Sequence, residues 1–285
     1  MKIGYLGPTG SFSEEALQLF LATQPEIMEP PVELIPFTTI PKLLNACQAL
    51  EIEGAFVPLE NSTEGQVAVT MDMLGQIENL YIMREFIHPV EQCLLTAKPL
   101  DFEEIEQVFS HEQALGQCRD FLETHLPQAS QSPCFSTTEA ATKISQNPDH
   151  NWAAIGPRRS AEIYNLHCLA EKIQDSTLNA TRFVFVGHHL AEMSEEDKTS
   201  LLIVTGDTPG SLADALQEFS LRSINLSRIE SRPSKKRLGE YVFFVDVDGY
   251  VFSSSLQDAL WALKNKGVNT KLLGSYPKAK PLTKN

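Results

Sequence analysis

The chain has 285 residues, and at about 150 residues per domain this length favours two domains. Hydrophobic residues make up 42% and charged residues 21%, which excludes collagen-like, disordered and coiled-coil proteins. The formal net charge of −14 argues against a general nucleic-acid-binding protein, and no apolar run reaches the roughly 18 residues that a membrane span needs. We therefore expect neither a nucleic acid nor a membrane as a partner.

Five cysteines are spread along the chain without a Cys-x-x-Cys pair. An odd count at irregular spacing is typical of reduced thiols in a cytoplasmic protein rather than of a disulfide framework or a zinc site. The seven histidines contain no His-x-His or His-x-x-x-His pair, so we expect no metal site. The first residues lack the apolar run of a secretory signal, and we predict a cytoplasmic protein.

Charge divides the chain into two parts of opposite sign. Residues 1–197 contain 10 Lys+Arg and 29 Asp+Glu, a net charge of −19, whereas residues 198–285 contain 13 and 8, a net charge of +5. The acidic stretch 192–197 lies where the sign changes. We predict a linker there, between two domains.

Strands and helices alternate in the acidic part, beginning with a strand, a glycine-rich turn and a helix capped by Ser13. We predict strands over residues 2–6, 32–35, 54–58, 81–83, 92–95, 107–109, 152–155 and 182–186. The predicted helices cover residues 14–21, 40–50, 113–122, 138–145 and 159–164. This alternation indicates an α/β fold with a mostly parallel sheet.

The last third has a different order of elements. We predict strands over residues 200–204, 224–229, 241–245 and 268–273, helices over 209–221 and 253–263, and a basic turn at 235–237. This order, βαββαβ, is the ferredoxin-like motif. One face of its antiparallel sheet lacks helices and is a common place for a partner or a small ligand.

The glycine-rich turn after the first strand has three possible roles. Gly4, Gly7 and Gly10 are three residues apart, which does not match the spacing of a dinucleotide-binding turn, and no Lys-Ser/Thr pair completes a P-loop. The favoured interpretation is a tight turn that needs glycine. The remaining interpretation is a turn whose N–H groups and the hydroxyls of Ser11 and Ser13 face a small anion.

Other polar clusters also lie at strand ends. Asn61, Ser62 or Thr63 could cap a turn, and a lone histidine between a strand and a helix, such as His111, is more often a cap than a catalyst. Arg182 begins a strand in an acidic part that has only five arginines before residue 188. It could form a structural ion pair or bind an anionic ligand.

Seven motifs occur in a diagnostic order. They are Gly7-Pro8-x-Gly10-Ser11-Phe12-Ser13, Pro58-x-Glu60-Asn61-Ser62-x-x-Gly65, Ser110-His111-x-Gln113-Ala114-Leu115, Ser136-Thr137-x-x-Ala140-Ala141, Thr181-Arg182-Phe183, Gly210-Ser211-Leu212-Ala213 and Glu230-Ser231-Arg232-Pro233. In this order the chain resembles the prephenate dehydratases and the ACT domain fused to them, over residues 2–277. Glu112 stands where a proline is usual and Ser211 where an alanine is usual. Because no chorismate mutase segment precedes Met1, the chain resembles a monofunctional form.

The resemblance implies a fold and a set of domains. The catalytic domain would cover residues 1–189 and would be similar to periplasmic binding proteins, with a cleft between two α/β subdomains. These subdomains would cover residues 1–76 plus 174–189, and 77–173. A linker would follow over 190–198, a ferredoxin-like ACT domain over 199–277, and a tail over 278–285.

The resemblance also implies the reaction. Prephenate, a dianion, would lose carbon dioxide and hydroxide to give phenylpyruvate, and because aromatisation drives the reaction, no cofactor would be needed. Thr181 would donate a hydrogen bond to the leaving hydroxyl, Arg182 would bind a carboxylate, and Glu60 or His111 would supply the proton. The implied catalytic residues are Thr181, Arg182, Phe183, Glu60, Asn61, Ser62, Ser110, His111 and Gln113. The implied substrate-binding residues are Thr9, Ser11, Ser13, Ser136 and Thr137.

The ACT resemblance implies feedback regulation by L-phenylalanine, bound between the ACT domains of a homodimer; a homotetramer would be a dimer of such dimers. Amides at a helix N-terminus would hold the effector's carboxylate, Glu230 or Asn225 its amino group, and Leu212 and Leu226 its ring. The implied effector-binding residues are Gly210, Ser211, Leu212, Asn225, Leu226, Glu230 and Ser231. Three alternatives stay open: an arogenate dehydratase, a periplasmic-type binding protein and a non-catalytic amino-acid sensor.

Overall fold

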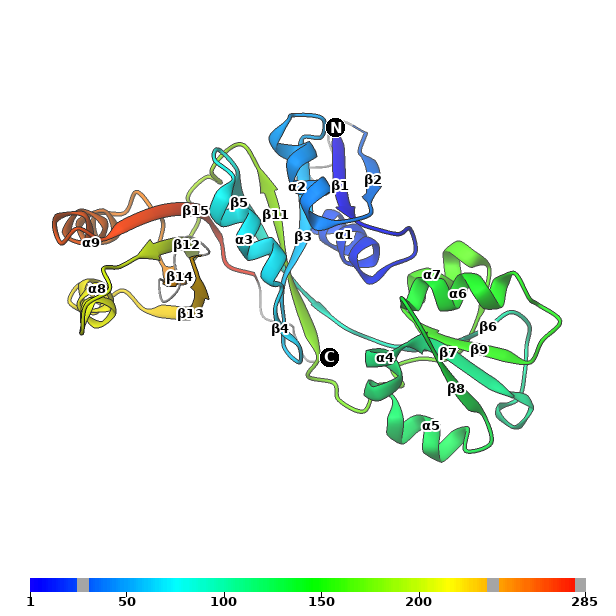
Figure 1. The fold of residues 1–285 in the computed structure, drawn as a ribbon. Helices are drawn as coiled ribbons and strands as arrows, with labels where there is room; N and C mark the ends of the chain where they lie inside the picture. Colours follow the sequence, from blue (N-terminus) through cyan, green and yellow to red (C-terminus); the bar gives the residue numbers. More distant parts are fainter. Residues whose placement is uncertain (25–30, 235–240, 280–285) are drawn as a thin grey trace. The chain divides into compact units, whose positions relative to one another are not determined.

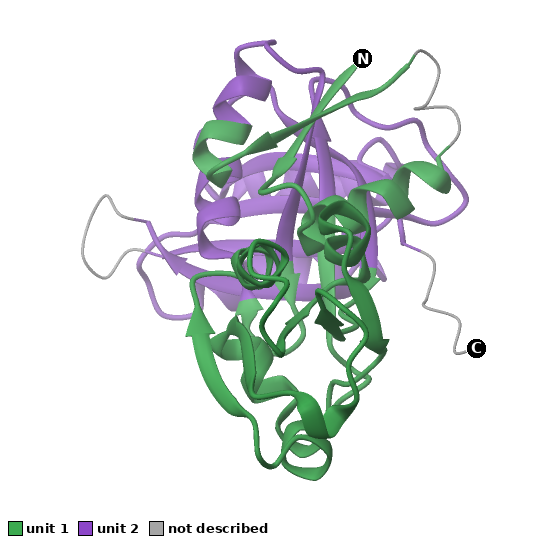
Figure 2. Cartoon of the chain, turned by 90° about the vertical axis from the view of Figure 1, so that its right-hand side faces the viewer, with its two compact units in different colours: residues 1–43, 60–65, 88–183 green, residues 44–59, 66–87, 184–285 purple. Residues whose placement is uncertain are grey.

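A computed structural model describes residues 1–24, 31–234 and 241–279. The predicted basic turn at 235–237 and most of the predicted tail lie outside these residues. The chain divides into two compact units, shown in Figure 2. Unit 1 comprises residues 1–43, 60–65 and 88–183, and unit 2 comprises residues 44–59, 66–87 and 184–285. In the described ranges, no helix is both long and apolar enough to cross a membrane.

Unit 1 begins with the predicted strand, turn and helix. Strand β1 (Lys2–Leu6) pairs in parallel with β2 (Glu33–Phe37), and helix α1 (Phe12–Ala22) lies between them in the chain. The predicted cap at Ser13 is wrong. The cap is Ser11, whose Oγ accepts a hydrogen bond from the N–H of Glu14, so the helix begins one half-turn earlier than the apolar spacing indicates.

Most of the rest of unit 1 is built on a five-stranded sheet with the order β10-β6-β9-β7-β8. Figure 1 labels β6, β7, β8 and β9 of this sheet. Its strands are β6 (Cys93–Thr96), β7 (Gln107–His111), β8 (Ser130–Cys134), β9 (Trp152–Gly156) and β10 (His167–Ala170). Its helices are α4 (Glu112–Gln117), α5 (Arg119–His125), α6 (Thr137–Ser145) and α7 (Arg158–Tyr164), with a 3-10 turn η2 (Phe102–Glu104).

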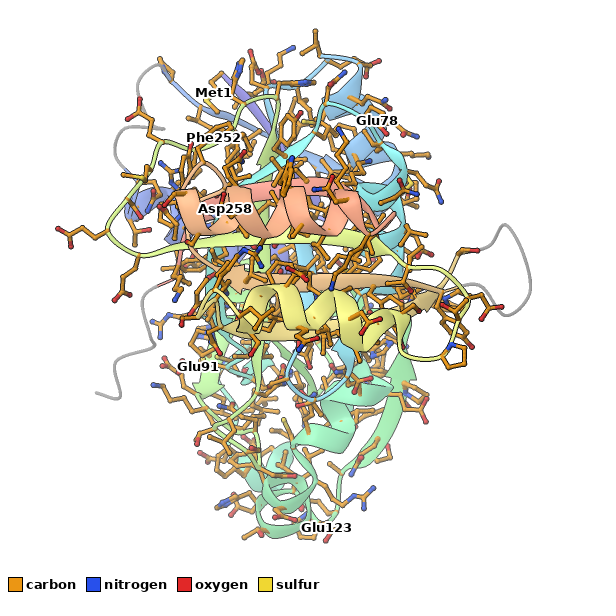
Figure 3. The ribbon with its side chains drawn as sticks, turned by 90° about the vertical axis from the view of Figure 1, so that its left-hand side faces the viewer. Met1, Glu78, Glu91, Glu123, Phe252 and Asp258 are labelled. Carbon is orange, nitrogen blue, oxygen red and sulfur yellow. The ribbon has the colours of Figure 1, made fainter. Side chains whose placement is uncertain are left out.

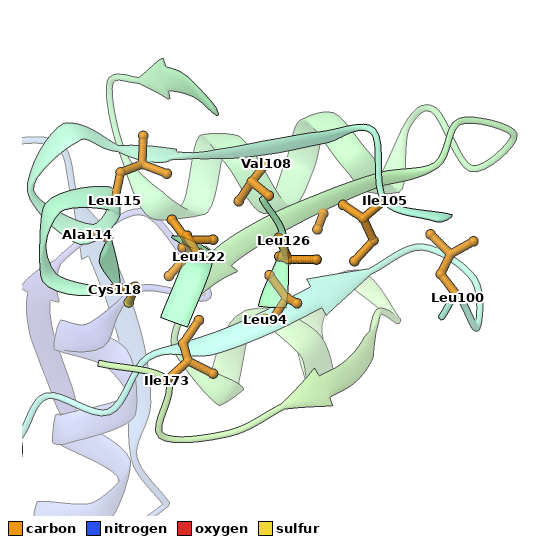
Figure 4. Close-up of a cluster of buried hydrophobic side chains, with 12 residues drawn as sticks. Leu94, Leu100, Ile105, Val108, Ala114, Leu115, Cys118, Leu122, Leu126 and Ile173 are labelled. Carbon is orange, nitrogen blue, oxygen red and sulfur yellow. The ribbon is translucent and has the colours of Figure 1, made fainter. Parts of the chain in front are cut away.

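Alternating side chains give this sheet two apolar faces. Leu94 and Val108 pack with Leu115 and Leu122 of α4 and α5, in the cluster that Figure 4 shows. Their neighbours Leu95 and Phe109 point to the other face, against Ala140 and Ile144 of α6. The predicted helix over 113–122 is instead two helices, separated at Cys118.

Unit 2 contains the remaining elements. These are α2 (Ile40–Gln48), β3 (Gly54–Asn61), β4 (Gly65–Gln66), α3 (Ala68–Gln76), β5 (Tyr81–Pro89) and β11 (Ala180–Gly187), some of which begin or end in unit 1. The C-terminal elements are β12 (Asp197–Val204), α8 (Ser211–Ser220), β13 (Leu226–Pro233), β14 (Tyr241–Asp248), α9 (Ser254–Asn265) and β15 (Asn269–Pro277). The predicted βαββαβ order and the α/β class are confirmed.

The C-terminal strands form an antiparallel run in the order β13-β14-β12-β15, and β15 continues in parallel with β5 through Gly274 and Ile82. Figure 3 shows α8 and α9 side by side over this sheet, with Asp258 on α9. The buried core under the helices includes Ile203, Phe219 and Val245. Helix α3 packs against the other face of the sheet.

Candidate active site

Two segments of unit 1 that are far apart in the sequence are joined by hydrogen bonds around Ser62. The Ser62 N–H donates to the Ala180 carbonyl at 2.9 Å, and its hydroxyl donates to the Leu178 carbonyl at 3.0 Å. The Ala180 N–H donates back to the Ser62 hydroxyl at 3.0 Å. These bonds place the end of β3 beside the start of β11, and with them two of the predicted motifs.

At this junction the structure brings Asn61 and Thr181 together. The Nδ2 of Asn61 donates to the Oγ1 of Thr181 at 2.9 Å and to the Oδ1 of Asn179 at 2.9 Å. The Oδ1 of Asn61 accepts from the backbone N–H groups of Thr63 and Glu64, at 2.9 and 3.0 Å. Asn61 therefore caps a turn, as one interpretation of the sequence expects, and also holds the hydroxyl of Thr181.

Arg182 and Glu60 extend the same pair of strands. The guanidinium Nη1 of Arg182 lies 4.0 Å from Glu60 Oε2, and the side chains are 12% and 39% exposed. A planar guanidinium is the side chain that matches a carboxylate through two parallel hydrogen bonds. Phe183 is buried, and its ring packs edge-on against His88 at a centroid distance of 6.5 Å.

The glycine-rich turn is held by the protein's own groups. Gly10 has a φ of +87°, which confirms that this turn needs glycine. Its N–H donates to Glu14 Oε2 at 2.5 Å, and Glu14 Oε1 accepts from Arg159 Nη2 at 2.9 Å. The Ser11 hydroxyl lies 3.3 Å from the Leu6 carbonyl and Ser13 is buried. The N–H of Gly10 is therefore already satisfied by a carboxylate rather than aimed at a free anion.

Thr9, in the same turn, faces two tyrosines. Its hydroxyl lies 3.3 Å from the Tyr5 hydroxyl, and its carbonyl accepts from the Tyr164 hydroxyl at 3.2 Å. Burial raises the pKa of Tyr5, so its hydroxyl stays neutral beside Thr9 at ordinary pH. Tyr164 and Pro8 also line a cavity of about 390 Å³ together with Ser136 and residues of α6.

The remaining predicted catalytic and substrate-binding residues lie at the end of β7 and at the starts of α4 and α6. The Ser110 hydroxyl is buried and donates to the Ile155 carbonyl at 2.7 Å, and His111 Nδ1 accepts from the Gln113 N–H at 3.3 Å. Ser136 caps α6 through the N–H of Glu139, and Thr137 is the first residue of that helix. Among the described residues, no hydrogen bond or ion pair links Ser110, His111 or Gln113 to the Asn61–Thr181 pair.

The predicted effector residues lie in unit 2, in two groups. Gly210, with a φ of +88°, and Ser211 begin α8; Ser211 and Leu212 line a cavity of about 140 Å³ that also includes Thr208 and Phe243. The other residues follow β13: Asn225 precedes it and donates to Asp248 at 3.3 Å, Leu226 begins it, and Glu230 and Ser231 lie within it. Ser231 pairs with Phe243 across the strands, next to the cavity.

The sheet face that the sequence leaves open is covered by helix α3. Each of the four strands contributes a contact to α3 or its ends. Arg232 of β13 forms a two-bond ion pair with Asp72, at 2.9 and 3.2 Å. Lys271 of β15 donates to the carbonyls of Gly75 and Ile77, and Gly75 faces Phe244 of β14 and Leu202 of β12. Gln66, just before α3, donates to Glu230 at 2.6 Å.

A family model described as prephenate dehydratase matches residues 3–191, which contain every predicted catalytic and substrate-binding residue.

The chain belongs to the prephenate dehydratase family.

A second family model, for the ACT domain, matches residues 199–250. The prephenate dehydratase of Lactococcus lactis subsp. cremoris (strain MG1363) is 36% identical, with 97% of each chain covered. That of Bacillus subtilis (strain 168) is 34% identical, with 97% of this chain and 98% of the relative covered. The crystal structure of prephenate dehydratase from Arthrobacter aurescens in complex with L-Phe is 34% identical, has a TM-score of 0.85, and is matched over 98% of this chain and 90% of that chain.

Sequence reasoning missed two parts of this prephenate dehydratase fold. Asn179 is two residues before Thr181, so an extended backbone places both side chains on one side, and that spacing was an available signal. Helix α3 has Gly75 near its end and a weak apolar pattern. Its contacts with Arg232 and Lys271 come from strands about 160 to 200 residues later, and nothing local in the sequence indicates them.

Proposed function

We infer that this chain converts prephenate to phenylpyruvate with loss of carbon dioxide and water, as a carbon–oxygen lyase of the prephenate dehydratase family. Prephenate has a hydroxyl and a carboxylate on opposite ring carbons. The carboxylate's bond to the ring breaks and its electron pair aromatises the ring, while the hydroxyl leaves with a proton as water. The enzyme must therefore donate a hydrogen bond to the hydroxyl without neutralising the reacting carboxylate.

The observation that carries this assignment is the hydrogen bond from Asn61 to Thr181. Because the Thr181 oxygen accepts that bond, its own proton is directed elsewhere, and we assign it to the leaving hydroxyl. Arg182, next in the strand, would bind the dianion through a planar guanidinium. Glu60 and His111 are the candidates for the group that finally supplies the proton. Both residues are at least partly exposed to solvent, with which they can exchange protons.

The remaining predicted residues would act mainly by holding segments in place. Ser62, Ser110 and Ser136 each bond to the backbone, and Phe183 is buried. Gln113 lies in the first turn of α4 and Thr137 begins α6. We propose these two residues, with Thr9, Ser11 and Ser13, as the walls of the substrate site. The loop holding Thr9 and the start of α6 meet at the 390 Å³ cavity.

Regulation by L-phenylalanine is the second part of the proposal. An ACT domain is present, and the related Arthrobacter aurescens enzyme was crystallised with L-Phe. The start of α8 offers backbone amides for a carboxylate, and the adjoining 140 Å³ cavity contains Leu212 and Phe243 for an aromatic ring. Because Asn225, Glu230 and Ser231 lie outside this cavity, a complete effector site would use a second copy of the chain, in a homodimer or a dimer of dimers.

The deciding experiment uses the purified full chain. Phenylpyruvate formation from prephenate is followed with and without L-phenylalanine, and kcat/KM is compared for prephenate and arogenate. We expect prephenate to be turned over and phenylalanine to reduce the rate. Binding of prephenate without turnover would favour a binding protein or sensor, and a higher kcat/KM on arogenate would favour an arogenate dehydratase. Recovery of the active protein in the soluble cytoplasmic fraction would test the expected location.

A further inference from the structure

We propose that Asn179 is a positioning residue for the reaction: it fixes the amide of Asn61, and through that amide it directs the hydroxyl proton of Thr181 toward the substrate. The inference rests on the proposed function of the same site. It comes from a set of four hydrogen bonds that leaves the Asn61 amide only one orientation, and from the burial of Asn179, which is 6% exposed.

The first step concerns the orientation of the Asn61 amide. Its oxygen accepts from the N–H groups of Thr63 and Glu64, so its nitrogen must point the other way, toward β11. An amide nitrogen has two hydrogens. One goes to Asn179 Oδ1 and the other to Thr181 Oγ1, both at 2.9 Å, so the amide has no spare donor.

The second step concerns Thr181. A hydroxyl has one hydrogen and two lone pairs. Since Asn61 occupies a lone pair, the hydrogen is not needed for that bond and points away from Asn61. In the part of the chain that the structure describes, Thr181 makes no other side-chain hydrogen bond. A free donor next to Arg182 is what departure of the prephenate hydroxyl requires.

The third step concerns what Asn179 adds. Its carbonyl accepts from the Val90 N–H at 2.9 Å, and the next residue, Ala180, is bonded to Ser62, so its backbone is held on both sides. Its side chain is buried, at 6% exposed, and its Oδ1 accepts from Asn61 Nδ2 at 2.9 Å, so the side-chain oxygen has little room to move. Without that oxygen one hydrogen of the Asn61 amide loses its partner, and the amide can turn away from Thr181. A catalytic donor that is misplaced by about 1 Å can lose a hundredfold in rate.

The test is a double-mutant cycle with separate kcat and KM measurements. We expect Asn179→Ala to lower kcat by about tenfold or more with KM changed less than about threefold, because the lost positioning acts in the transition state. In the Thr181→Ala background the same change should have little further effect on kcat, because the hydroxyl that it positions is gone. Asn147→Ala removes the hydrogen bond from another asparagine side chain, which donates to the Lys143 carbonyl at 2.8 Å; it is the control and should leave kcat unchanged.

Two further variants keep the outcome clear. Asn179→Asp retains the acceptor and should recover most of kcat while raising KM, because a carboxylate beside a dianion repels it. Asn179→Ser replaces Asn179→Ala if the alanine variant does not fold. Wild-type kcat in Asn179→Ala, or a tenfold loss on top of Thr181→Ala, would overturn the inference alone. No turnover of prephenate by the wild type, or full activity in Thr181→Ala, would overturn the proposed function and this inference with it.

Discussion

In the proposed mechanism, one hydrogen bond gives the weakly acidic hydroxyl of Thr181 a defined task. A threonine hydroxyl does not ionise near neutral pH, so its contribution must come from where its proton points. Because the Thr181 oxygen accepts from Asn61 at 2.9 Å, that proton points away from Asn61. The same reasoning separates Thr181 from Ser110, whose hydroxyl already donates to the Ile155 carbonyl.

Replacing the hydroxyl should therefore affect turnover more than folding. We expect Thr181→Ala to lower kcat by about 10²-fold or more, the usual scale for a proton-donating group, whereas Thr181→Ser should retain much of it. Thermal unfolding should be nearly unchanged in both variants, since the side chain is small and only partly buried. Equal kcat for the alanine and serine variants would remove the hydroxyl from the mechanism.

Arg182 should act on substrate affinity. Arg182→Lys keeps the positive charge beside Glu60 but loses the planar fork that matches a carboxylate. We expect KM for prephenate to rise by roughly tenfold with kcat within a few-fold, because the bond is made in the ground and transition states alike. An unchanged KM would leave Arg182 with the structural ion pair only. Steady-state kinetics at fixed ionic strength measures the difference.

Cys47 provides a prediction on pH. Burial raises the pKa of its thiol from 9.0 to about 11. Between pH 9 and 11 the thiol ionises in the unfolded chain but stays neutral in the folded one. The free energy of unfolding that is present below pH 9 therefore falls as the pH rises to 11, by about 1.4 kcal/mol per pH unit. The difference in unfolding free energy between wild type and Cys47→Ala, measured with urea, should therefore shrink between pH 8.5 and 10.5. A constant difference would contradict this.

At the scale of the elements, helix α3 is where sequence and structure differ most. The strands of the C-terminal sheet can be predicted from their alternating apolar residues. The predicted bounds of β12 and β14 lie within a few residues of those in the structure. Strand β8 contains Ser130 and Pro133 and lies at a sheet edge, where a polar strand with proline is tolerated. Its sequence therefore lacks the apolar alternation by which a strand is predicted. Helix α3 depends on partners that come much later in the chain.

The contact of α3 with β13 should connect the effector site to the catalytic segment. Glu230, in the predicted effector motif, accepts from Gln66, which directly follows the 60–65 segment containing Asn61. We expect Asp72→Ala and Arg232→Lys, which break the same two-bond pair, to shift phenylalanine inhibition to roughly five- to tenfold higher concentration. Uninhibited kcat should stay near wild type, with Lys278→Ala as a surface control.

Binding and inhibition must be measured separately in these variants. If calorimetry shows that phenylalanine still binds while inhibition is weakened, the pair transmits the effect. If inhibition is unchanged in both variants, the α3 contact has only a structural role.

At the scale of the whole molecule, the residues predicted for catalysis and those predicted for regulation lie in different units. Every predicted catalytic and substrate-binding residue lies in unit 1, and every predicted effector residue lies in unit 2. This assignment of residues to catalysis and regulation could be predicted from the sequence, because each motif is a short contiguous segment. The sequence could not show that unit 2 also contains β5, α3 and most of β3, because chain order says nothing of packing.

Truncation after residue 196 should test this separation. All residues of the proposed catalytic site remain, so we expect turnover of prephenate without inhibition by phenylalanine. The shortened chain should have a melting temperature well below that of the full chain, because α3 loses the sheet that packs against it. In addition Glu85, which is 8% exposed, loses the hydrogen bond from Lys198 at 2.9 Å. Phenylalanine should raise the melting temperature of the full chain only. Inhibition of the truncated enzyme at the same concentration would place the effector in the catalytic site.

The C-terminal run of strands ends at β13, and this edge affects how copies of this protein can associate. With α8 and α9 on one face of the regulatory sheet and α3 on the other, β13 is left as a sheet edge with backbone groups that any extended peptide could join. That strand carries Arg228, Glu230, Arg232 and Pro233, and charges and proline are the residues that discourage indiscriminate strand addition. Only a surface with matching charges and register could add to this edge, and a second copy of the same strand is one such surface.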